Sequence, residues 1–488
     1  MTGTSLIALA LILPAATAAL IPLFHHRPNL REAVTLIGAL ALFATVLLLL
    51  ADVLAGGRPA LSLVEILPGL SLALAVEPLG MLFATVASGL WIVNSLYSVG
   101  YMRAENAPRQ TSFYVCFALA IAATMGLALA GNLFTLFLFY EALTLSTYPL
   151  VTHRATPEAV RAGRLYLLML VGASTLLLLP AVAWTGVAAG TLDFAPGGIL
   201  AGKIGDAAAG VLLALFVFGA AKAAVMPLHF WLPAAMVAPT PVSALLHAVA
   251  VVKAGVFTIV KVIVYVFGID MLAQNSAADW LVYVAGVTVL IASLIALRQD
   301  DLKRRLAYST VSQLSYIVLG AALFTPIAIL GAVLHIAAHA VSKITLFFAA
   351  GSIHTAAHID KISGMNGIGR RMPWTMAAFS VGALSMIGVP PTAGFLGKWF
   401  ILVGAIAVGQ WFAVAVIIVS TLLNAGYFLP IVYRAFWGEP AAGSKTPSGH
   451  GEASWPIVVS LVATAVATVL LFLFPAIPYR LATMLVPL

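Results

Sequence analysis

Long runs of apolar residues, separated by short polar or Pro/Gly-rich breaks, extend over almost the whole chain. A helix that crosses a bilayer needs about 20 consecutive, mostly apolar residues, and the breaks leave about fourteen such segments. We expect helices at 3–23, 32–51, 78–100, 111–129, 132–152, 163–187, 207–237, 241–267, 279–297, 305–323, 326–357, 373–408, 411–436 and 454–474. The segment 57–77 is too broken to span a membrane and predicts an extracytoplasmic hairpin.

Three of these segments, 207–237, 326–357 and 373–408, are longer than a simple span. The first is interrupted at Met226-Pro227 and the third at 388–394, the sequence GVPPTAG. Proline breaks a helix, and broken backbone at membrane depth is tolerated only inside protein or beside a wet cavity. Because the seventh and twelfth helices are both broken, the pattern predicts two inverted five-helix repeats, helices 4–8 and 9–13, as found in transporters.

The chain should therefore be organised as an all-α polytopic membrane protein with four parts. The expected parts are residues 1–110 (helices 1–3), 111–267 (first repeat), 268–436 (second repeat) and 437–488 (a cytoplasmic loop and helix 14).

Composition and charge support a membrane protein. The chain is 62% apolar and only 8% charged, with a mean hydropathy of +1.10, which excludes an ordinary soluble enzyme. Most of the 24 Lys and Arg residues fall in loops that follow odd-numbered helices. Since cytoplasmic loops carry the positive charge, we expect both termini outside the cytoplasm. The net charge of +8 then needs no nucleic-acid partner to explain it.

Ionisable residues inside the predicted spans are the best candidates for function, because a charged group at the bilayer centre costs at least about 2.5–3.5 kcal/mol. Glu141 is the only acid well inside a span, and Lys222 lies about one turn before the break of helix 7. We predict that these two residues pair, either as a proton-coupled switch or as a structural salt bridge. Lys253 on helix 8 is a further candidate, whereas Lys261 lies near a helix end and is expected to snorkel to the surface.

Histidines accompany these lysines. His247 precedes Lys253 on helix 8 and is either part of the same path or an ordinary buried histidine. On helix 11, His335, His339 and Lys343 recur at i, i+4 and i+8, which places them along one stripe of the helix. The His pair could bind zinc, but no third ligand is evident. A hydrated proton path is the favoured interpretation. Lys398 follows the break of helix 12.

Signatures of other energy sources are missing from the sequence. No phosphate-binding G-x-x-x-x-G-K-[ST] loop occurs, 364–369 has the wrong spacing for a dinucleotide site, and the single cysteine, Cys116, excludes a cysteine cluster or disulfide framework. We expect no cofactor and no redox or hydrolytic chemistry in this chain. The driving energy would come from an ion gradient or from a partner.

Four motifs together resemble a known family. They are 139–146 (FYEALTLS), 222–233 (KAAVMPLHFWLP), 239–247 (PTPVSALLH) and 388–391 (GVPP). They resemble the antiporter-like subunits shared by Mrp-type multisubunit Na⁺/H⁺ antiporters, respiratory complex I (subunits L, M and N) and energy-converting hydrogenases. The chain is most similar to the D-type subunit of Mrp antiporters. The resemblance implies a proton path along the membrane midplane through the matching residues Glu141, Lys222, Lys253 and Lys398.

The resemblance also implies a function and partners. The chain should conduct protons as a subunit of a cation/proton antiporter in a prokaryotic inner membrane. Its partners would be other membrane subunits and the lipid bilayer, and Na⁺ or K⁺ would be the exchanged ion. The alternative is a proton-pumping subunit of a redox-driven complex, so membership of an enzyme stays open. A stand-alone transporter of an organic solute is a third class, but the lysine-rich axis disfavours it.

Overall fold

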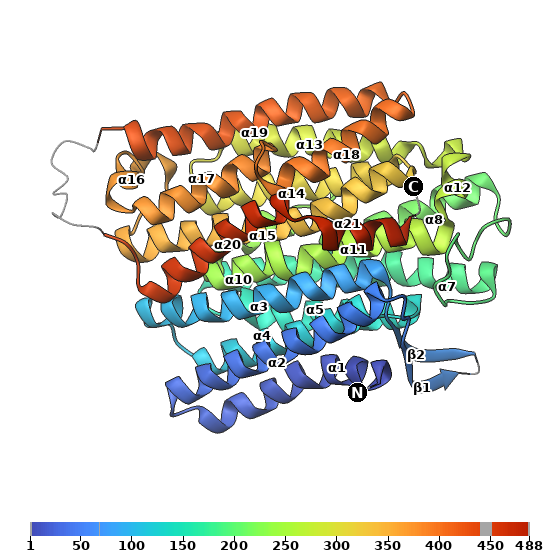
Figure 1. The fold of residues 1–488 in the computed structure, drawn as a ribbon, viewed down its shortest axis with the longest axis horizontal. Coiled ribbons are helices and arrows are strands. Elements are labelled where there is room, and N and C mark those ends of the chain that lie inside the picture. Colours follow the sequence, from blue (N-terminus) through green and yellow to red (C-terminus); the bar gives the residue numbers. More distant parts are fainter. Residues whose placement is uncertain (1, 68, 440–450, 487–488) are drawn as a thin grey trace.

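The computed structural model describes residues 2–67, 69–439 and 451–486, and the protein is a bundle of helices that lie roughly parallel to one another (Figure 1). The first helices are α1 (Gly3–Leu20), η1 (Ile21–Phe24), α2 (Pro28–Leu54), α3 (Pro78–Ala104), α4 (Gln110–Ala128), α5 (Leu133–Val151), α6 (Pro157–Ala173), η2 (Ser174–Leu178) and α7 (Leu179–Ala189). The middle helices are α8 (Asp206–Gly219), η3 (Ala221–Ala223), α9 (Trp231–Ala234), η4 (Ala235–Val237), α10 (Thr240–Ala244), η5 (Leu245–Val249), α11 (Val251–Val262), η6 (Ile263–Phe267), α12 (Ile269–Ala273) and η7 (Ser276–Ala278). The last helices are α13 (Trp280–Arg298), α14 (Leu302–Ala322), α15 (Pro326–Ala357), η8 (Ile362–Gly364), α16 (Ile368–Arg371), α17 (Pro373–Ile387), α18 (Ala393–Ala407), α19 (Trp411–Trp437), α20 (Trp455–Leu473) and α21 (Ala476–Leu485).

The fold is the predicted all-α membrane architecture. Within the described ranges, 11 helices are long and apolar enough to cross a membrane. Three shorter apolar helices, α8, α17 and α18, belong to the predicted seventh and twelfth spans. The predicted tenth span corresponds to α14, whose first turns are basic and polar, so it is not among the 11. The count of fourteen therefore stays a prediction. Much of the predicted loop in 437–488 lies outside the described residues.

Both predicted helix breaks are present. Between α8 and α9 the chain forms only the short η3 and a series of turns, and α17 is separated from α18 by residues 388–392. By contrast, α15 runs unbroken for 32 residues. A further break, which no proline or glycine marks, occurs in the eighth span at Ala250, where φ is −124° and ψ is −68°.

The predicted hairpin at 57–77 is also present. Strands β1 (Ala60–Leu67) and β2 (Leu70–Ala75) pair antiparallel, with Ala60 opposite Ala75. The backbone N–H of Ala75 donates to the carbonyl of Leu129 at 2.7 Å, which attaches β2 to the end of α4. Both ends of the described chain lie on this side, which we call the hairpin end (Figure 1). Most of the loop arginines lie at the opposite end of the bundle, which we call the arginine-rich end.

Two spans form the centre of the bundle. The most apolar 18-residue stretch of Thr240–Phe267 is 100% buried and that of α15 is 89% buried, against 39% for α19 and α20. The peripheral helices therefore leave much of their apolar surface exposed. By contrast, α15 and the eighth span, which comprises α10, η5, α11 and η6 and is called helix 8, are enclosed by protein. These two central spans hold most of the predicted histidines and lysines.

Candidate proton pathway

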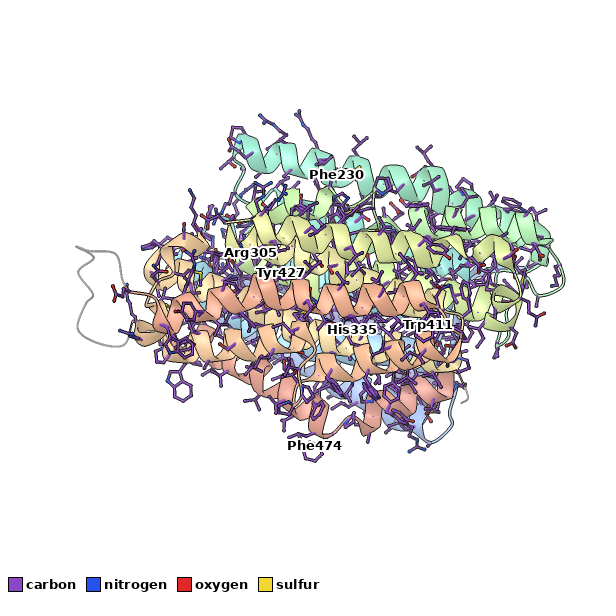
Figure 2. The ribbon with its side chains drawn as sticks, turned by 90° about the horizontal axis from the view of Figure 1, so that it is seen from above. Phe230, Arg305, His335, Trp411, Tyr427 and Phe474 are labelled. Atoms are coloured by element: carbon purple, nitrogen blue, oxygen red, sulfur yellow. The ribbon has the colours of Figure 1, made fainter. Side chains whose placement is uncertain are left out.

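The centre of the site is the contact between helix 8 and α15. Nζ of Lys253, on α11, donates a hydrogen bond to Nδ1 of His339, and both side chains are fully buried. His335 lies one turn away on α15, with its ring centroid 6.3 Å from that of His339. Figure 2 shows His335 near the middle of the length of the bundle. The predicted stripe on helix 11 and the lysine of helix 8 thus meet inside the protein.

A buried glutamine continues this contact toward the second broken helix. Nε2 of His335 is 3.0 Å from Oε1 of Gln313 on α14, and Nε2 of Gln313 donates to the carbonyl of Met386 at 3.2 Å. Nζ of Lys398 donates to the same carbonyl at 2.7 Å and to that of Ile387 at 3.1 Å. Gln313 was not among the predicted residues, because an amide in a polar helix carries no signal of its partners.

The position of Lys398 follows from the break in helix 12. A helix leaves its last carbonyls without intrahelical partners and carries partial negative charge at its C-terminus. Met386 and Ile387 are the last residues of α17, so their carbonyls face the ammonium group of Lys398. The break therefore supplies acceptors for a buried cation that has no carboxylate within 4.0 Å in the described structure.

Lys343 lies at the arginine-rich side of the same stripe. Its Nζ donates to Oγ of Ser309 at 2.9 Å and weakly to the carbonyl of Leu306 at 3.4 Å. Tyr427 on α19 donates to the same serine at 3.1 Å.

His247, on η5, is fully buried, and neither of its ring nitrogens has a hydrogen-bond partner among the described residues. Its ring instead packs against Phe347 at 4.6 Å between centroids.

The predicted ion pair between Glu141 and Lys222 is not formed in the described structure. Nζ of Lys222 donates to the carbonyl of Tyr140 at 2.6 Å and lies 3.1 Å from the centre of the Tyr140 ring. No carboxylate oxygen of Glu141 lies within the 4.0 Å of an ion pair with Lys222. Consecutive residues of a helix point about 100° apart, so Tyr140 and Glu141 present different sides of α5, and Tyr140 is the one that contacts Lys222. Oε1 of Glu141 is buried without a hydrogen-bond partner in the described structure.

The expectation that Lys261 snorkels to the surface is also wrong. Its side chain is 0% exposed, and its Nζ forms an ion pair with Oε1 of Glu77 at 3.0 Å. The N-terminal turn of α3, the end of α4 and the ring of Phe194 enclose it. Glu77 was expected to lie outside the spans. The available signal was an acid directly before Pro78 at the start of an apolar run, which is typical of a helix N-terminus.

A cavity of about 560 Å³ opens at the arginine-rich end. Its walls include Arg154, Lys303 and Thr240, the first residue of helix 8. His354 also lines the cavity, and its Nδ1 contacts Oδ1 of Asp360 at 2.7 Å. Water in this cavity would reach the end of the span that carries His247 and Lys253. Among the described residues, no group of three or more His, Cys, Asp or Glu side chains is placed to hold a metal ion.

Comparison with known sequences gives the same family as the motifs. Residues 130–424 match the family model described as NADH:quinone oxidoreductase/Mrp antiporter, TM. The chain is 33% identical over 452 residues to NADH-quinone oxidoreductase subunit N of Desulforudis audaxviator, covering 90% of this chain and 89% of that protein. It is 28% identical over 441 residues to the D-type subunit of the Na(+)/H(+) antiporter of Alkalihalophilus pseudofirmus, covering 89% and 87%.

Solved structures have the same fold. A chain of the Mrp complex from Dietzia sp. DQ12-45-1b matches with a TM-score of 0.86 at 24% identity, covering 99% of this chain and 97% of that one. A chain of the membrane-bound sulfane sulfur reductase, an archaeal respiratory membrane complex, matches with a TM-score of 0.85 at 26% identity, covering 98% and 96%. The resemblance seen in the motifs is confirmed: the chain belongs to the NADH:quinone oxidoreductase/Mrp antiporter transmembrane family.

Proposed function

We propose that this protein conducts protons as a subunit of a multisubunit cation/proton antiporter of the Mrp type, in a role like that of the D-type subunit. The observation that carries the proposal is the buried row formed by Lys253, His339, His335 and Lys398. A hydrogen bond joins Lys253 to His339, and the rings of His339 and His335 lie 6.3 Å apart between centroids. Gln313 then connects His335 to the carbonyl group that holds Lys398. Burying protonatable groups inside a membrane costs free energy, and such groups are therefore typical of functional sites.

The partners of the lysines support a role in transfer. Within the described residues, Lys222, Lys343 and Lys398 are held by carbonyl, hydroxyl and aromatic groups rather than by carboxylates. Breaking a buried ion pair costs about 3–5 kcal/mol. An ammonium group held only by neutral acceptors can pass on its proton without that penalty. Lys253, whose partner is the imidazole of His339, can pass a proton to a group that itself carries protons.

Glu141 on α5 and Lys222 on η3 are proposed as one end of the path. In the structure Lys222 is bound to the carbonyl of Tyr140, the residue beside Glu141. We propose that Lys222 alternates between this carbonyl and the carboxylate of Glu141. The ammonium form of Lys222 is favoured more strongly beside the negative carboxylate than beside the neutral carbonyl. The turns between η3 and α9 allow this movement, because Lys222 is not fixed in a continuous helix. His247 and Lys343 are proposed to connect the path to the arginine-rich end.

A redox-driven pump is the second candidate function. It is favoured by the higher identity to NADH-quinone oxidoreductase subunit N, 33%, than to the D-type subunit of the Na(+)/H(+) antiporter, 28%. In that case the same path would be driven by a partner that carries the redox chemistry.

The organisation and surroundings follow from the same proposal. We propose that 111–267 and 268–436 are inverted repeats, since each contains a helix that is broken beside a proline, and that 1–110 and 437–488 flank them. Other membrane subunits would cover the peripheral helices. We further propose Na⁺ or K⁺ as the exchanged ion, the prokaryotic inner membrane as the location, and both termini outside the cytoplasm.

The test uses the intact complex, purified through this chain in mild detergent and reconstituted in liposomes. An imposed Na⁺ or K⁺ gradient should drive proton movement, measured with an enclosed pH-sensitive dye. Lys222→Ala should reduce the rate by about 100-fold, as for loss of an acid–base group, while the complex still assembles. Lys203→Ala is the control, since Lys203 is exposed and, within the described part of the chain, its Nζ donates only to the carbonyl of Ala189.

Normal transport by an assembled Lys222→Ala complex would refute the proposed path. The subunits that co-purify separate the two candidate functions. Iron–sulfur, flavin or nickel subunits would favour the redox-driven pump, whereas membrane subunits alone would favour the antiporter.

A further inference from the structure

The ion pair at the hairpin end is a buried acid–base group that the path described above does not use. Oε1 of Glu77 accepts a hydrogen bond from Nζ of Lys261 at 3.0 Å, and Oε2 accepts one from Oη of Tyr265 at 2.6 Å. Nζ of Lys261 also donates to the carbonyl of Ala130 at 2.9 Å. We call Glu77, Lys261 and Tyr265 the hairpin-end triad. It joins helix 8 to the start of α3 and the end of α4.

The triad lies on the same helix as the centre of the path. Lys261 follows Lys253 by eight residues on α11, about 12 Å further along the helix axis. The direction is toward the hairpin end, away from Thr240 and the cavity. Helix 8 therefore carries one buried amine at the central contact and a second one between that contact and the hairpin surface.

Solvent exposure increases across the triad from Lys261 to Glu77, as expected where a proton leaves the protein. The side chain of Lys261 is 0% exposed, whereas that of Glu77 is 15% exposed. The lysine thus lies on the protein side of the pair, and the carboxylate lies on the side that water can reach. Glu77 follows directly on β2 and is held in place by the N–H groups of Leu79 and Gly80, at 3.1 and 3.0 Å, at the N-terminus of α3.

We propose that the hairpin-end triad is the proton-transfer site that connects the central path to the hairpin side of the membrane, an inference that rests on the proposed function. A proton moves from Nζ of Lys261 to Oε1 of Glu77 along their hydrogen bond, which leaves a neutral amine and a neutral carboxylic acid. The acid then releases its proton to water at the hairpin end. The amine then takes up a proton from the Lys253 side through water, which restores the original ion pair. In total, one proton has moved from the central path to the hairpin end.

The energetics of a buried pair allow this step. Two buried charges lose much of their hydration energy, and this penalty narrows the advantage of the ion pair over the neutral pair that one proton transfer produces. The hydroxyl of Tyr265 stays bound to Glu77 in either state, because a carboxylic acid keeps an acceptor oxygen.

Arginine at position 261 separates a transfer role from a structural one. Lys261→Arg keeps the positive charge and can keep the ion pair, but a guanidinium does not lose its proton in proteins. Glu77→Gln keeps one acceptor oxygen, which can serve Lys261, but cannot accept a proton. In assembled complexes with unchanged thermal stability, each variant should reduce proton transport by about 100-fold. Glu77→Asp should retain part of the activity, and Lys203→Arg, at an exposed lysine of the same end, should have no effect.

Infrared difference spectra give a second readout. The wild-type complex should show a protonated-carboxyl band that Glu77→Gln removes, which a static ion pair would not produce. Wild-type and Lys222→Ala complexes in the same liposomes identify which proposal fails. If the wild type does not transport, or Lys222→Ala does, the proposed function is wrong. If they behave as expected but Lys261→Arg and Glu77→Gln transport normally, only the role of the triad is refuted.

Discussion

Replacement of Gln313 by leucine tests the contact that joins the two halves of the path. In Gln313→Leu the side chain keeps a similar volume, but the two hydrogen bonds of the amide are lost, one to His335 and one to the carbonyl of Met386. Met386 would keep Lys398 and Asn424 as donors. His335 would keep no partner in the described structure, because its Nδ1 already lacks one.

The expected loss of transport rate follows from the loss of the hydrogen-bond partner of His335. A buried polar group left without its partner costs about 1–3 kcal/mol. If that energy is added to the barrier for proton transfer through His335, the rate should fall by about 5- to 150-fold, since about 1.4 kcal/mol corresponds to a factor of ten. The assay is proton uptake by liposomes containing the complex, with equal amounts of assembled protein.

The control is Gln299→Leu. Gln299 lies at the arginine-rich end, and its side-chain amide makes only a weak bond to the carbonyl of Ile295 at 3.4 Å. This variant should transport at the wild-type rate. An assembled Gln313→Leu complex that is equally fast would show that proton transfer does not depend on the hydrogen bond between His335 and Gln313.

Two further predictions concern packing and pH. A Cβ atom added at Gly255 would lie 2.0 Å from the backbone N of Ala223. Gly255→Ala should therefore displace the segment that holds Lys222, slow transport and destabilise the protein by about 1–3 kcal/mol in a thermal-unfolding assay. Gly172→Ala, where the space is open, should leave both stability and transport unchanged. Asp300 accepts hydrogen bonds from Oγ and N of Ser363, which lower the pKa of Asp300. This stabilisation is present above the unfolded-state pKa of about 3.9 and is lost as the pH falls through the lower folded-state pKa. Ser363→Ala should therefore be less stable than the wild type above about pH 4, and this difference should shrink as the pH falls further, measured by thermal unfolding between about pH 3 and 5.

The sequence predicted features that depend on local chemistry. Proline marked the breaks beside Lys222 and Lys398, and charges within apolar runs marked Lys253. The spacing of His335 and His339 placed them on one stripe, as the structure has them. These signals are local, because helix breaking and the burial of a charge are decided within a few turns of one helix.

The partners of these residues depend on how helices pack and could not be read from one sequence. Tyr140 and Glu141 are neighbours, and only the rotation of α5 decides which of them faces Lys222. The same holds for Gln313, whose partners come from two other helices. The ion pair of Lys261 joins residues 184 positions apart. The break at Ala250 has no local signal, since neither proline nor glycine occurs in 244–250.

The spacing of the two lysines on helix 8 has an electrical consequence. The hydrocarbon core of a bilayer is about 30 Å thick, so the axial distance of about 12 Å between Lys253 and Lys261 is about 40% of it. A proton that moves between them along the membrane normal therefore works with or against about 0.9 kcal/mol for each 100 mV of membrane potential. Transfers between groups at one depth, such as neighbouring side chains on facing helices, carry no such term. The membrane voltage would thus act on the steps along helix 8 and leave the lateral steps unaffected.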